Sequence, residues 1–428
     1  MALKDYEADM MRCSRCSYCK FVPWVKVDAR FATVCPSIAR FNFHAYSAGG
    51  RLAAGLAFLK ERFGYSDGLL DIIYKCQICG ACDVSCKISR DLEPLEALLE
   101  FRAKCVEDGQ LLPAHLVLIE SLRKEDNMMQ RPKAERGKWA EALKVKDLTK
   151  EKADVAFHAG CRLSFDEELW KIAQGAITLL KHADIDVGIL GGEEVCCGGR
   201  AYEMGFQGEF TKYMDHNIET WKTAGVKTIV TTCSDCYGTF KAYYSRFGHR
   251  EFKIFHITEY LHSLLKKGRL RLTKKVPIFV TYHDPCHLGR MSEPYEYSSP
   301  GKPYITPEKK VAGQLIIHDP PKPWRRGANG VYEAPRELLK SIPGLRLIEM
   351  KRIKEYGWCC GAGGGVKEAY PDFALWTARE RIKEAKSTGA EALVTACPWC
   401  ERNFNDTLKE GGDGIKVFDL IELLENAL

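Results

Sequence analysis

One cysteine pattern occurs twice in this sequence. In the second copy Cys359-Cys360-Gly361 is followed by Cys397-Pro398-Trp399-Cys400, and in the first copy Cys196-Cys197-Gly198 is followed by Cys233-Ser234-Asp235-Cys236. A single cysteine precedes each copy, and these two are Cys161 and Cys286. Repetition of a five-cysteine set indicates two copies of one domain, each built around the same group of thiols.

The spacing of the two copies supports this duplication. The second gap holds 35 residues (198 to 232) in the first copy and 36 (361 to 396) in the second. The first gap holds 34 residues (162 to 195) in one copy and 72 in the other. We therefore predict an insert at Met291 to Asn329, because removing it brings the repeat almost into register.

Three ordinary roles for these ten cysteines can be weighed. Structural zinc takes four ligands, usually as two separated Cys-x-x-Cys pairs, so a five-cysteine set with an adjacent pair fits it poorly. Disulfides are disfavoured because the chain opens with Met-Ala-Leu-Lys-Asp-Tyr-Glu and shows no apolar signal segment, which predicts a reducing compartment. The segment Cys397-Pro398-Trp399-Cys400 resembles a redox dithiol after a strand, but a lone dithiol leaves eight further cysteines unexplained.

Eight more cysteines lie near the N-terminus. The spacing Cys76-x-x-Cys79-x-x-Cys82-x-x-x-Cys86 is typical of two-cluster ferredoxins, in which three close cysteines hold one cubane [4Fe-4S] cluster and the fourth reaches the other. Its partner Cys13-x-x-Cys16-x-x-Cys19 is followed by Cys35-Pro36 only after 15 residues. Crossed ligation predicts one cluster on Cys13, Cys16, Cys19 and Cys86, and another on Cys76, Cys79, Cys82 and Cys35.

The five-cysteine sets predict a different kind of cluster. Thiolate is a soft, charged ligand that suits iron, and four thiolates leave a cubane with no open site. Adjacent cysteines serve two corners of one regular cubane poorly, so each set suggests an opened cluster. Gly361-Ala362-Gly363-Gly364-Gly365 could instead form a nucleotide loop, but it lacks the strand, G-x-G-x-x-G and helix context. We expect these glycines to let backbone N–H groups approach cluster sulfurs.

With these motifs the chain resembles the catalytic D subunit of heterodisulfide reductase, a ferredoxin-like domain fused to two CCG domains. The resemblance covers nearly the whole length. It implies two noncubane [4Fe-4S] clusters that lie on either side of a disulfide and split it between them. The implied ligands are Cys161, Cys196, Cys197, Cys233 and Cys236 for one cluster, and Cys286, Cys359, Cys360, Cys397 and Cys400 for the other.

The resemblance implies an iron-sulfur oxidoreductase in which electrons pass from two cubane clusters to the noncubane pair, which reduces a disulfide. The alternative is an electron-transfer module of a larger anaerobic complex, such as a class II benzoyl-CoA reductase assembly, whose substrate is reduced on another subunit. A structural metal-binding scaffold would instead predict zinc without redox activity. The expected partners are redox subunits that bear flavin, ferredoxin or cytochrome, together with a small-molecule disulfide.

Length and composition agree with a multidomain globular protein. The chain has 428 residues, of which 46% are apolar, and shows no apolar run of the roughly 18–20 residues that span a bilayer. The net charge is +6 and the basic residues are scattered, which disfavours nucleic-acid binding. We expect a cytoplasmic protein whose membrane link, where there is one, comes through a partner.

The predicted fold is α+β and multidomain, with a helical two-cluster ferredoxin-like domain followed by two repeated α/β, Rossmann-like lobes. Helical stretches at 50–60 and 95–106 distinguish the first domain from the compact β-rich ferredoxins. We predict domains at 1–105, 153–270 and 271–428, with a charged helical linker at 106–152 laid over the surface. Strands are expected at 155–161, 187–190, 228–233, 252–255, 277–282, 345–350, 392–397 and 415–418.

In both repeats the cysteines follow predicted strands, where parallel α/β sheets place their sites. Two lobes that face each other would bring both sets to one cleft. His158, His283 and His287 flank the first cysteine of each set and could supply protons, although a buried structural histidine is commoner. Cys105 is expected to be an inert buried thiol. Trp24, the Lys20 to Val34 insertion and the 291–329 insert are candidate docking surfaces or simple surface loops.

Overall fold

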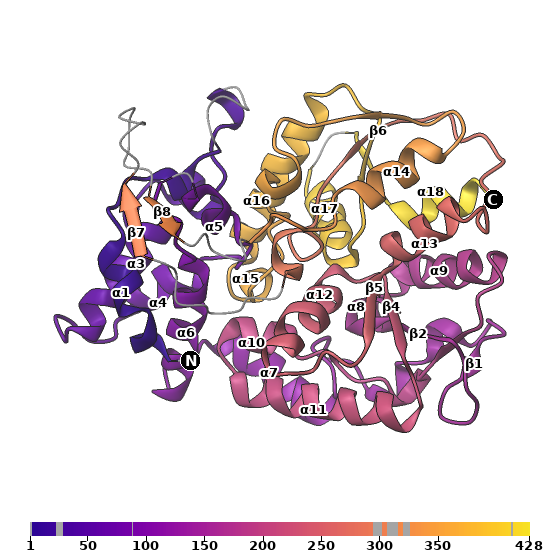
Figure 1. Cartoon of the computed structure of the whole chain (residues 1–428), viewed down its shortest axis with the longest axis horizontal. Coiled ribbons are helices and arrows are strands. Elements are labelled where there is room, and N and C mark those ends of the chain that lie inside the picture. Colours follow the sequence, from indigo (N-terminus) through magenta and orange to yellow (C-terminus); the bar gives the residue numbers. More distant parts are fainter. Residues whose placement is uncertain are drawn as a thin grey trace.

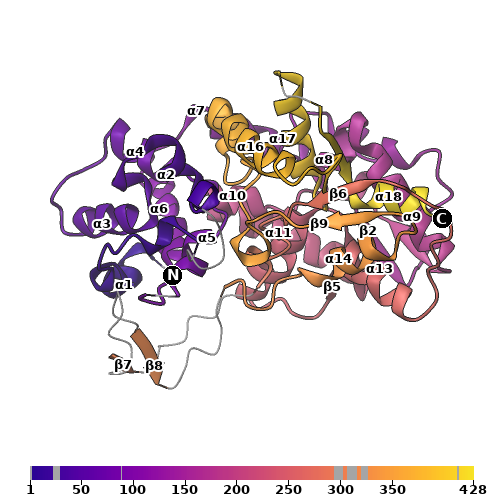
Figure 2. The same cartoon turned by 90° about the horizontal axis from the view of Figure 1, so that it is seen from above.

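The computed structural model describes residues 2–22, 29–87, 89–293, 302–305, 316–319, 326–411 and 414–428. An N-terminal helical domain stands at one end of the molecule, and two α/β repeats share the other end (Figures 1 and 2). Residue Trp24 and most of the predicted insert lie outside the described residues.

The N-terminal domain is built from short helices joined by cysteine-bearing loops. Ser47 and Ser66 cap two of these helices, because each side chain accepts a hydrogen bond from a backbone N–H in the first turn. The helices are α1 (Glu7–Arg12), α2 (Pro36–Phe41), α3 (Ala48–Leu59), α4 (Asp67–Tyr74), α5 (Ala81–Cys86) and α6 (Pro94–Glu107), and α7 (Pro113–Glu125) follows the domain in the sequence.

The first repeat surrounds a parallel sheet with the strand order β1-β3-β2-β4-β5. Its strands are β1 (Lys146–Asp147), β2 (Val155–His158), β3 (Val187–Ile189), β4 (Thr228–Thr231) and β5 (Lys253–His256). Its helices are α8 (Gly160–Phe165), α9 (Trp170–His182), α10 (Gly199–Met204), α11 (Gln207–Thr223), α12 (Ser234–Gly238), which runs into a π-helix at Thr239–Tyr244, and α13 (Ile257–Lys266).

The second repeat has a parallel sheet with the strand order β11-β10-β6-β9. Its strands are β6 (Phe279–Tyr282), β9 (Arg346–Ile348), β10 (Ala392–Thr395) and β11 (Lys416–Asp419), and an antiparallel pair within the predicted insert adds β7 (Lys302–Ile305) and β8 (Ile316–Asp319). Its helices are α14 (Glu333–Ser341), α15 (Val366–Ala369), α16 (Pro371–Lys386), α17 (Pro398–Lys409) and α18 (Leu420–Asn426).

The two sheets confirm the predicted fold class and its internal repeat. If β2, β3, β4 and β5 are matched in order with β6, β9, β10 and β11, the strand order is the same in both sheets. The helix after the last strand also begins in the same way in each repeat. His256 with Glu259, and Asp419 with Glu422, form capping boxes at these two helix starts.

The two repeats share an apolar core. Helix α9 packs against α18, and α13 packs against α14, so the outer helices of one repeat cover those of the other. One continuous cluster of buried side chains includes Ile172 and Leu180 from the first repeat and Ile421 and Leu424 from the second. Burial of such side chains contributes on the order of 1.5–3 kcal/mol each, so the repeats form one packed unit.

Residues 106–152 differ from the expectation of a surface linker. Leu118, Ile119 and Leu122 of α7 are buried against Ala201 and Met204 of the first repeat. The same segment adds strand β1 to the edge of the first sheet. The sequence shows the amphipathic spacing of α7. It does not show which surface the apolar face of α7 packs against, because that surface is formed only in the tertiary structure.

Arg102 on α6 joins all three parts of the molecule. Its side chain is fully buried. The guanidinium donates to the carbonyl oxygens of Glu203 in the first repeat and Gly364 in the second, each at 2.9 Å. It also donates within the N-terminal domain, to the carbonyl oxygens of Ile73 (3.1 Å), Tyr74 (3.2 Å) and Cys76 (2.7 Å).

Replacing this hub should destabilise the whole chain. We expect Arg102→Met to lower the free energy of unfolding by about 3 kcal/mol or more, because five carbonyl oxygens lose this donor and a buried acceptor left unsatisfied costs about 1–3 kcal/mol. The measurement is an anaerobic urea titration followed by circular dichroism. As a control, Arg131→Ala removes an exposed pair with Glu135 and should cost less than about 1 kcal/mol. A urea midpoint of Arg102→Met equal to that of the wild-type protein would contradict the role of the hub.

Candidate functional site

The first five-cysteine set lies at the carboxyl ends of three neighbouring strands. Cys161 follows β2, the Cys196-Cys197 pair follows β3, and Cys233 and Cys236 follow β4. All five side chains are buried. Their thiols lie in successive hydrogen-bonding contact in the order Cys161, Cys196, Cys197, Cys236, Cys233.

The second set repeats this arrangement. Cys286 follows β6, the Cys359-Cys360 pair follows β9, and Cys397 and Cys400 follow β10. These side chains are also buried. Their contacts run in the matching order Cys286, Cys359, Cys360, Cys400, Cys397.

The two sets meet where the repeats face each other. The thiols of Cys233 and Cys397 are in hydrogen-bonding contact. Beside them the hydroxyl of Ser234 donates to the carbonyl oxygen of Ala396 at 2.7 Å. All ten thiols therefore form one continuous buried series, and the Cys-x-x-Cys motifs join the two halves.

The eight N-terminal cysteines gather in two groups. Cys86 lies close enough to Cys13 and Cys19 for their charges to interact. Cys35 lies in the same way beside Cys76 and Cys79. Cys16 and Cys82 complete the groups, through interactions of Cys16 with Cys13 and Cys19, and of Cys82 with Cys76, Cys79 and Cys35.

A short β-bridge explains how Cys35 reaches its group despite the long gap after Cys19. Phe21 pairs with Thr33 in an isolated antiparallel bridge. The N–H of Val22 donates to Ala32 at 2.7 Å, and the N–H of Val34 donates to Lys20 at 2.8 Å. These bonds bring residues 20–22 next to residues 32–34. Cys35 therefore lies close to its group in spite of the long gap after Cys19.

One thiol contact connects the N-terminal domain to the second repeat. Cys79 lies in hydrogen-bonding contact with Cys359. Arg290 supports this junction, because its guanidinium donates to the carbonyl oxygen of Cys79 at 2.7 Å and to that of Gly357 at 2.8 Å. The described cysteines thus connect the two N-terminal groups to the ten-thiol series.

The glycines of the 361–365 segment serve two purposes. The N–H of Gly361 donates to the sulfur of Cys359 at 3.3 Å, and Gly198 makes the matching bond to Cys196 at 3.4 Å. Gly363 instead lies against the N-terminal domain, where an added Cβ would come within 2.6 Å of the carbonyl oxygen of Gln77. The later glycines therefore allow close docking of two domains, a role that the spacing of the motif did not indicate.

Hydrogen bonds with a neighbouring thiol, together with a nearby cation, lower the pKa of the first cysteine in each set. A hydrogen bond from Cys196 and the nearby charge of Arg136 lower the pKa of Cys161 to about 6 against the effect of burial. Hydrogen bonding to Cys359 and the charge of His287 lower the pKa of Cys286 to about 5. Both thiols therefore favour the thiolate form, which is the form that binds metals.

The sequence does not predict a role for Arg136, because this residue lies in a charged segment that was expected to be solvated. Its side chain is buried, and its guanidinium contacts the sulfur of Cys161 at 3.6 Å and the carboxylate of Glu194 at 3.1 Å. Glu194 in turn accepts from the N–H groups of Ala159 and Gly160, each at 2.9 Å. This network holds the turn that carries Cys161, and no spacing pattern in the sequence indicates it.

The three candidate histidines occupy different positions. A nitrogen of His283 and the sulfurs of Cys360 and Cys400 all lie within 4.8 Å of one another. His158 is buried near Cys197, and burial lowers its pKa. His287 bridges the repeats.

The bridge runs from His287, which follows Cys286, to two carboxylates of the first repeat. One ring nitrogen lies 2.5 Å from Glu203, and the other lies 3.3 Å from Asp235 and 3.4 Å from the sulfur of Cys286. Although burial disfavours the charged ring, Glu203 and Asp235 raise the pKa of His287 well above its usual value. A proton is thus held between the two cysteine sets.

Arginine and tryptophan side chains form a wall of the interface between the repeats. The guanidinium groups of Arg162 and Arg200 lie over the ring of Trp399, at 3.9 and 3.7 Å from its centre, and Trp399 stands between Cys397 and Cys400 in the sequence. Arg200 also binds Glu368 of the second repeat at 2.8 Å. These cation–π contacts and the ion pair hold the second Cys-x-x-Cys motif against the first repeat.

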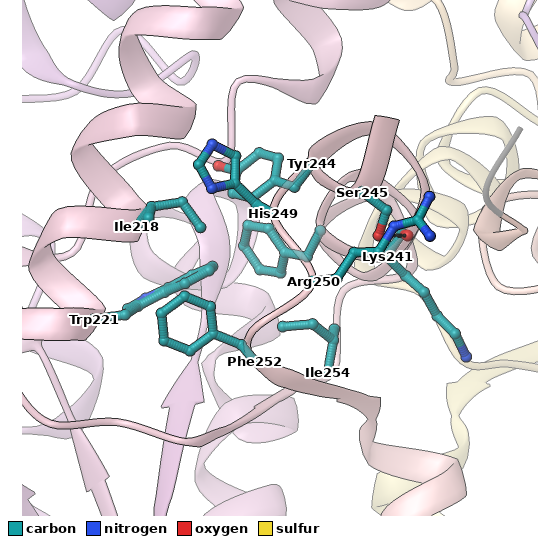
Figure 3. Close-up of a pocket in the computed structure, with 10 residues that line it drawn as sticks. Ile218, Trp221, Lys241, Tyr244, Ser245, His249, Arg250, Phe252 and Ile254 are labelled. Atoms are coloured by element: carbon teal, nitrogen blue, oxygen red, sulfur yellow. Dashed lines mark hydrogen bonds between the residues drawn. The ribbon is translucent and has the colours of Figure 1, made fainter. Parts of the chain in front are cut away.

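An aromatic cavity of about 290 Å³ lies behind the first cysteine set (Figure 3). Trp221, Tyr244 and Phe252 line it, together with the polar side chains of Lys241 and His249. The hydroxyl of Tyr244 donates to the carbonyl oxygen of Cys197 at 2.9 Å. Tyr244 therefore supports the backbone of the adjacent cysteine pair.

The donor sets fit iron-sulfur clusters. Each repeat offers five buried thiols in mutual contact, with backbone N–H groups aimed at two of the sulfurs. Thiolate is the ligand that such clusters use, and hydrogen bonds to sulfur tune their reduction potentials. Within the described residues every helix is too short or too polar to cross a membrane.

Family models assign the same chemistry to the same regions. Residues 9–89 match a 4Fe-4S dicluster domain. Residues 155–241 and 322–405 each match a cysteine-rich CCG domain. The chain is therefore an iron-sulfur protein with [4Fe-4S] and CCG domains.

Three proteins with similar sequences carry the names of redox proteins. The chain is 30% identical to the D subunit of the dihydromethanophenazine:CoB–CoM heterodisulfide reductase of Methanosarcina mazei, over 84% of this chain and 78% of that protein. It is 27% identical to the EtfAB:quinone oxidoreductase of Syntrophomonas wolfei, over 84% of this chain and 47% of that protein. It is 29% identical to a probable iron-sulfur-binding oxidoreductase of Bacillus subtilis, over 83% of this chain and 46% of that protein.

The close packing at Gly160 gives a test of the first cysteine set. Gly160 has a φ of 75°, and an added Cβ would lie 2.8 Å from the sulfur of Cys236. We expect Gly160→Ala to lose the iron held by the first set and to keep the iron of the N-terminal domain, as measured by iron analysis of the purified protein. Gly208→Ala is the control, because nothing lies within 4 Å of its added Cβ. Full iron content in Gly160→Ala would contradict this account.

Proposed function

Because the chain belongs to the family of the heterodisulfide reductase D subunit, whose members are iron-sulfur oxidoreductases, we propose that it reduces a disulfide between its two five-cysteine sets. One observation carries this proposal. Both sets are complete and buried, and they meet at the contact between Cys233 and Cys397. A substrate between the repeats would therefore have a complete thiol set on each side.

In this proposal four [4Fe-4S] clusters are bound. Two are cubanes, one on Cys13, Cys16, Cys19 and Cys86, and the other on Cys35, Cys76, Cys79 and Cys82. Two are noncubane, one on Cys161, Cys196, Cys197, Cys233 and Cys236, and the other on Cys286, Cys359, Cys360, Cys397 and Cys400. When bound, these groups supply one-electron transfer, and the opened clusters supply sites for substrate sulfur.

The contacts between cysteine groups support a linear order of the four sites. Cys19 of the first N-terminal group lies near Cys35 of the second. Cys79 of the second group contacts Cys359, and Cys397 contacts Cys233. Electrons that enter through the N-terminal domain would therefore reach the second repeat before the first.

Reduction of a disulfide takes two electrons and two protons, breaks one S–S bond and releases two thiols. His287 supports the supply of protons, since it lies between Cys286 and the carboxylates of Glu203 and Asp235. Burial of the ten thiols excludes water from the site. The positive charge of Arg136 beside Cys161 stabilises the negative charge that accumulates there.

The second candidate is an electron-transfer module whose substrate is reduced on a partner subunit. The similarity to an EtfAB:quinone oxidoreductase, of which this chain covers 47%, favours it. In that case the partners would be flavin-, ferredoxin- or cytochrome-bearing subunits, and any association with a membrane would come through them.

An anaerobic assay separates the two candidates. The holoprotein is mixed with reduced viologen and a panel of small disulfides, and thiol release is measured together with EPR spectra recorded with and without added thiols. Release of two thiols for every two electrons consumed, together with EPR spectra that change when thiols are added, supports the disulfide site. Electron uptake without any effect of disulfide or thiol supports the relay.

The cluster assignment predicts the metal content. Four [4Fe-4S] clusters require about sixteen irons per chain, with no stoichiometric zinc. Elemental analysis of anaerobically purified protein measures both metals. Zinc in stoichiometric amount with about half of that iron would rule out the assignment of the five-cysteine sets.

The paired cysteines predict a selective loss of activity. We expect Cys360→Ser to abolish disulfide reduction, because it removes a thiolate from the second set, and to preserve the EPR signals of the N-terminal clusters. Cys105→Ser is the matched control, because Cys105 is a buried thiol outside all four groups. Full activity of Cys360→Ser would show that the two-set site is wrong.

A further inference from the structure

The N-terminal domain holds the most accessible of the cysteine groups. All nineteen cysteines lie in the described residues, and Cys16 is the one that is exposed. Its group includes Cys13, which is partly exposed, whereas the ten cysteines of the repeats are buried. Electron transfer weakens steeply with distance, so exchange with another protein should occur at the group nearest the surface.

A depression of about 280 Å³ lies beside this group. Cys13 lines it, together with Met11, Arg15, Lys60 and Arg62. Of the described residues that line the depression, three are basic and none is acidic. Met11 is 61% exposed, which places an apolar side chain among these cations.

The charges around the depression are also predominantly positive. Lys20 and Arg15 lie near His44, and Arg90 donates to the hydroxyl of Ser14 at 2.9 Å. The carboxylates of this region are Glu7, which binds Lys60, Asp9, which binds Arg12, and exposed Glu61, which lies between Lys60 and Arg62 in the sequence. The face formed by Met11, Arg15, Cys16, Lys60 and Arg62 therefore keeps a positive excess after Glu7 and Glu61 are counted, and Lys20 and Arg90 beside it add to that excess.

We propose that this face, hereafter the entry face, docks a small acidic electron-carrier protein whose redox centre lies near its own surface. Exposed Met and Arg side chains are typical of the core of a protein interface. Acidic side chains on the carrier would complement Arg15 and Arg62 and steer its approach. This inference rests on the proposed function, since it names the chemistry of the electron donor.

Each docking event transfers one electron. The carrier is oxidised by one electron, and the N-terminal domain is reduced by one. Two such events and two protons are needed for every disulfide that is cleaved to two thiols. The carrier must leave between events, which favours a transient interface governed by charge.

The test is stopped-flow reduction of the holoprotein by a reduced, acidic two-cluster ferredoxin, monitored by the bleaching of iron-sulfur absorbance. We expect Arg15→Glu/Arg62→Glu to lower the second-order rate about tenfold or more at low salt and to abolish its salt dependence, because steering by charge changes association rates by roughly 10–1000-fold. Arg62→Glu alone, which is remote from the cysteines in sequence, should lower the rate about threefold.

Three controls make the result decisive. Reduced methyl viologen should reduce the double variant within about twofold of the wild-type rate, since a small donor needs no docking face. Lys227→Glu, an exposed change just before β4, should leave the ferredoxin rate unchanged. Iron content should match that of the wild-type protein.

Several outcomes would overturn the entry face. These are an unchanged ferredoxin rate in the double variant, a wild-type rate independent of salt, or no reduction by ferredoxin when viologen succeeds. Loss of binding to phosphatidylserine vesicles with an unchanged ferredoxin rate would identify a membrane contact instead. Failure of viologen-reduced wild-type protein to reduce any disulfide would count against the proposed function and leave the docking result intact.

Discussion

The structure depends on the buried guanidinium of Arg102, because it is the point at which the N-terminal domain and both repeats share hydrogen bonds. A backbone carbonyl that is buried without a donor is costly, and Arg102 supplies donors to carbonyls of all three parts. One of these, the carbonyl of Cys76, belongs to an N-terminal cysteine group. The arrangement of the domains and the position of the thiols are therefore set by the same interaction.

The order of the thiols follows from the parallel sheets. Parallel strands end at one edge, so the three cysteine segments of each repeat converge there without any long-range pairing signal in the sequence. Because the repeats face each other at these edges, the Cys-x-x-Cys motifs that follow β4 and β10 meet. A duplicated domain thereby produces two equivalent sites in contact.

Local patterns predicted much of this molecule. The eight expected strands all occur, with ends that differ by a few residues, since alternating apolar runs and flanking helices are local signals. Cysteine spacing also predicted the groups in which thiols lie together. The contact of Cys79 with Cys359, the burial of Arg136 and the docking of Gly363 on Gln77 were not predictable. Each depends on how separately folded parts pack, which no spacing within one segment records.

The buried arginines offset the free-energy cost of burying the cysteine thiolates. Thiolates in an interior from which water is excluded carry charge that is expensive to bury, unless opposite charge lies close by. Arg136 contacts Cys161, Arg290 lies near Cys79 and Cys286, and both side chains are almost fully buried. Part of the net positive charge thus lies inside the molecule.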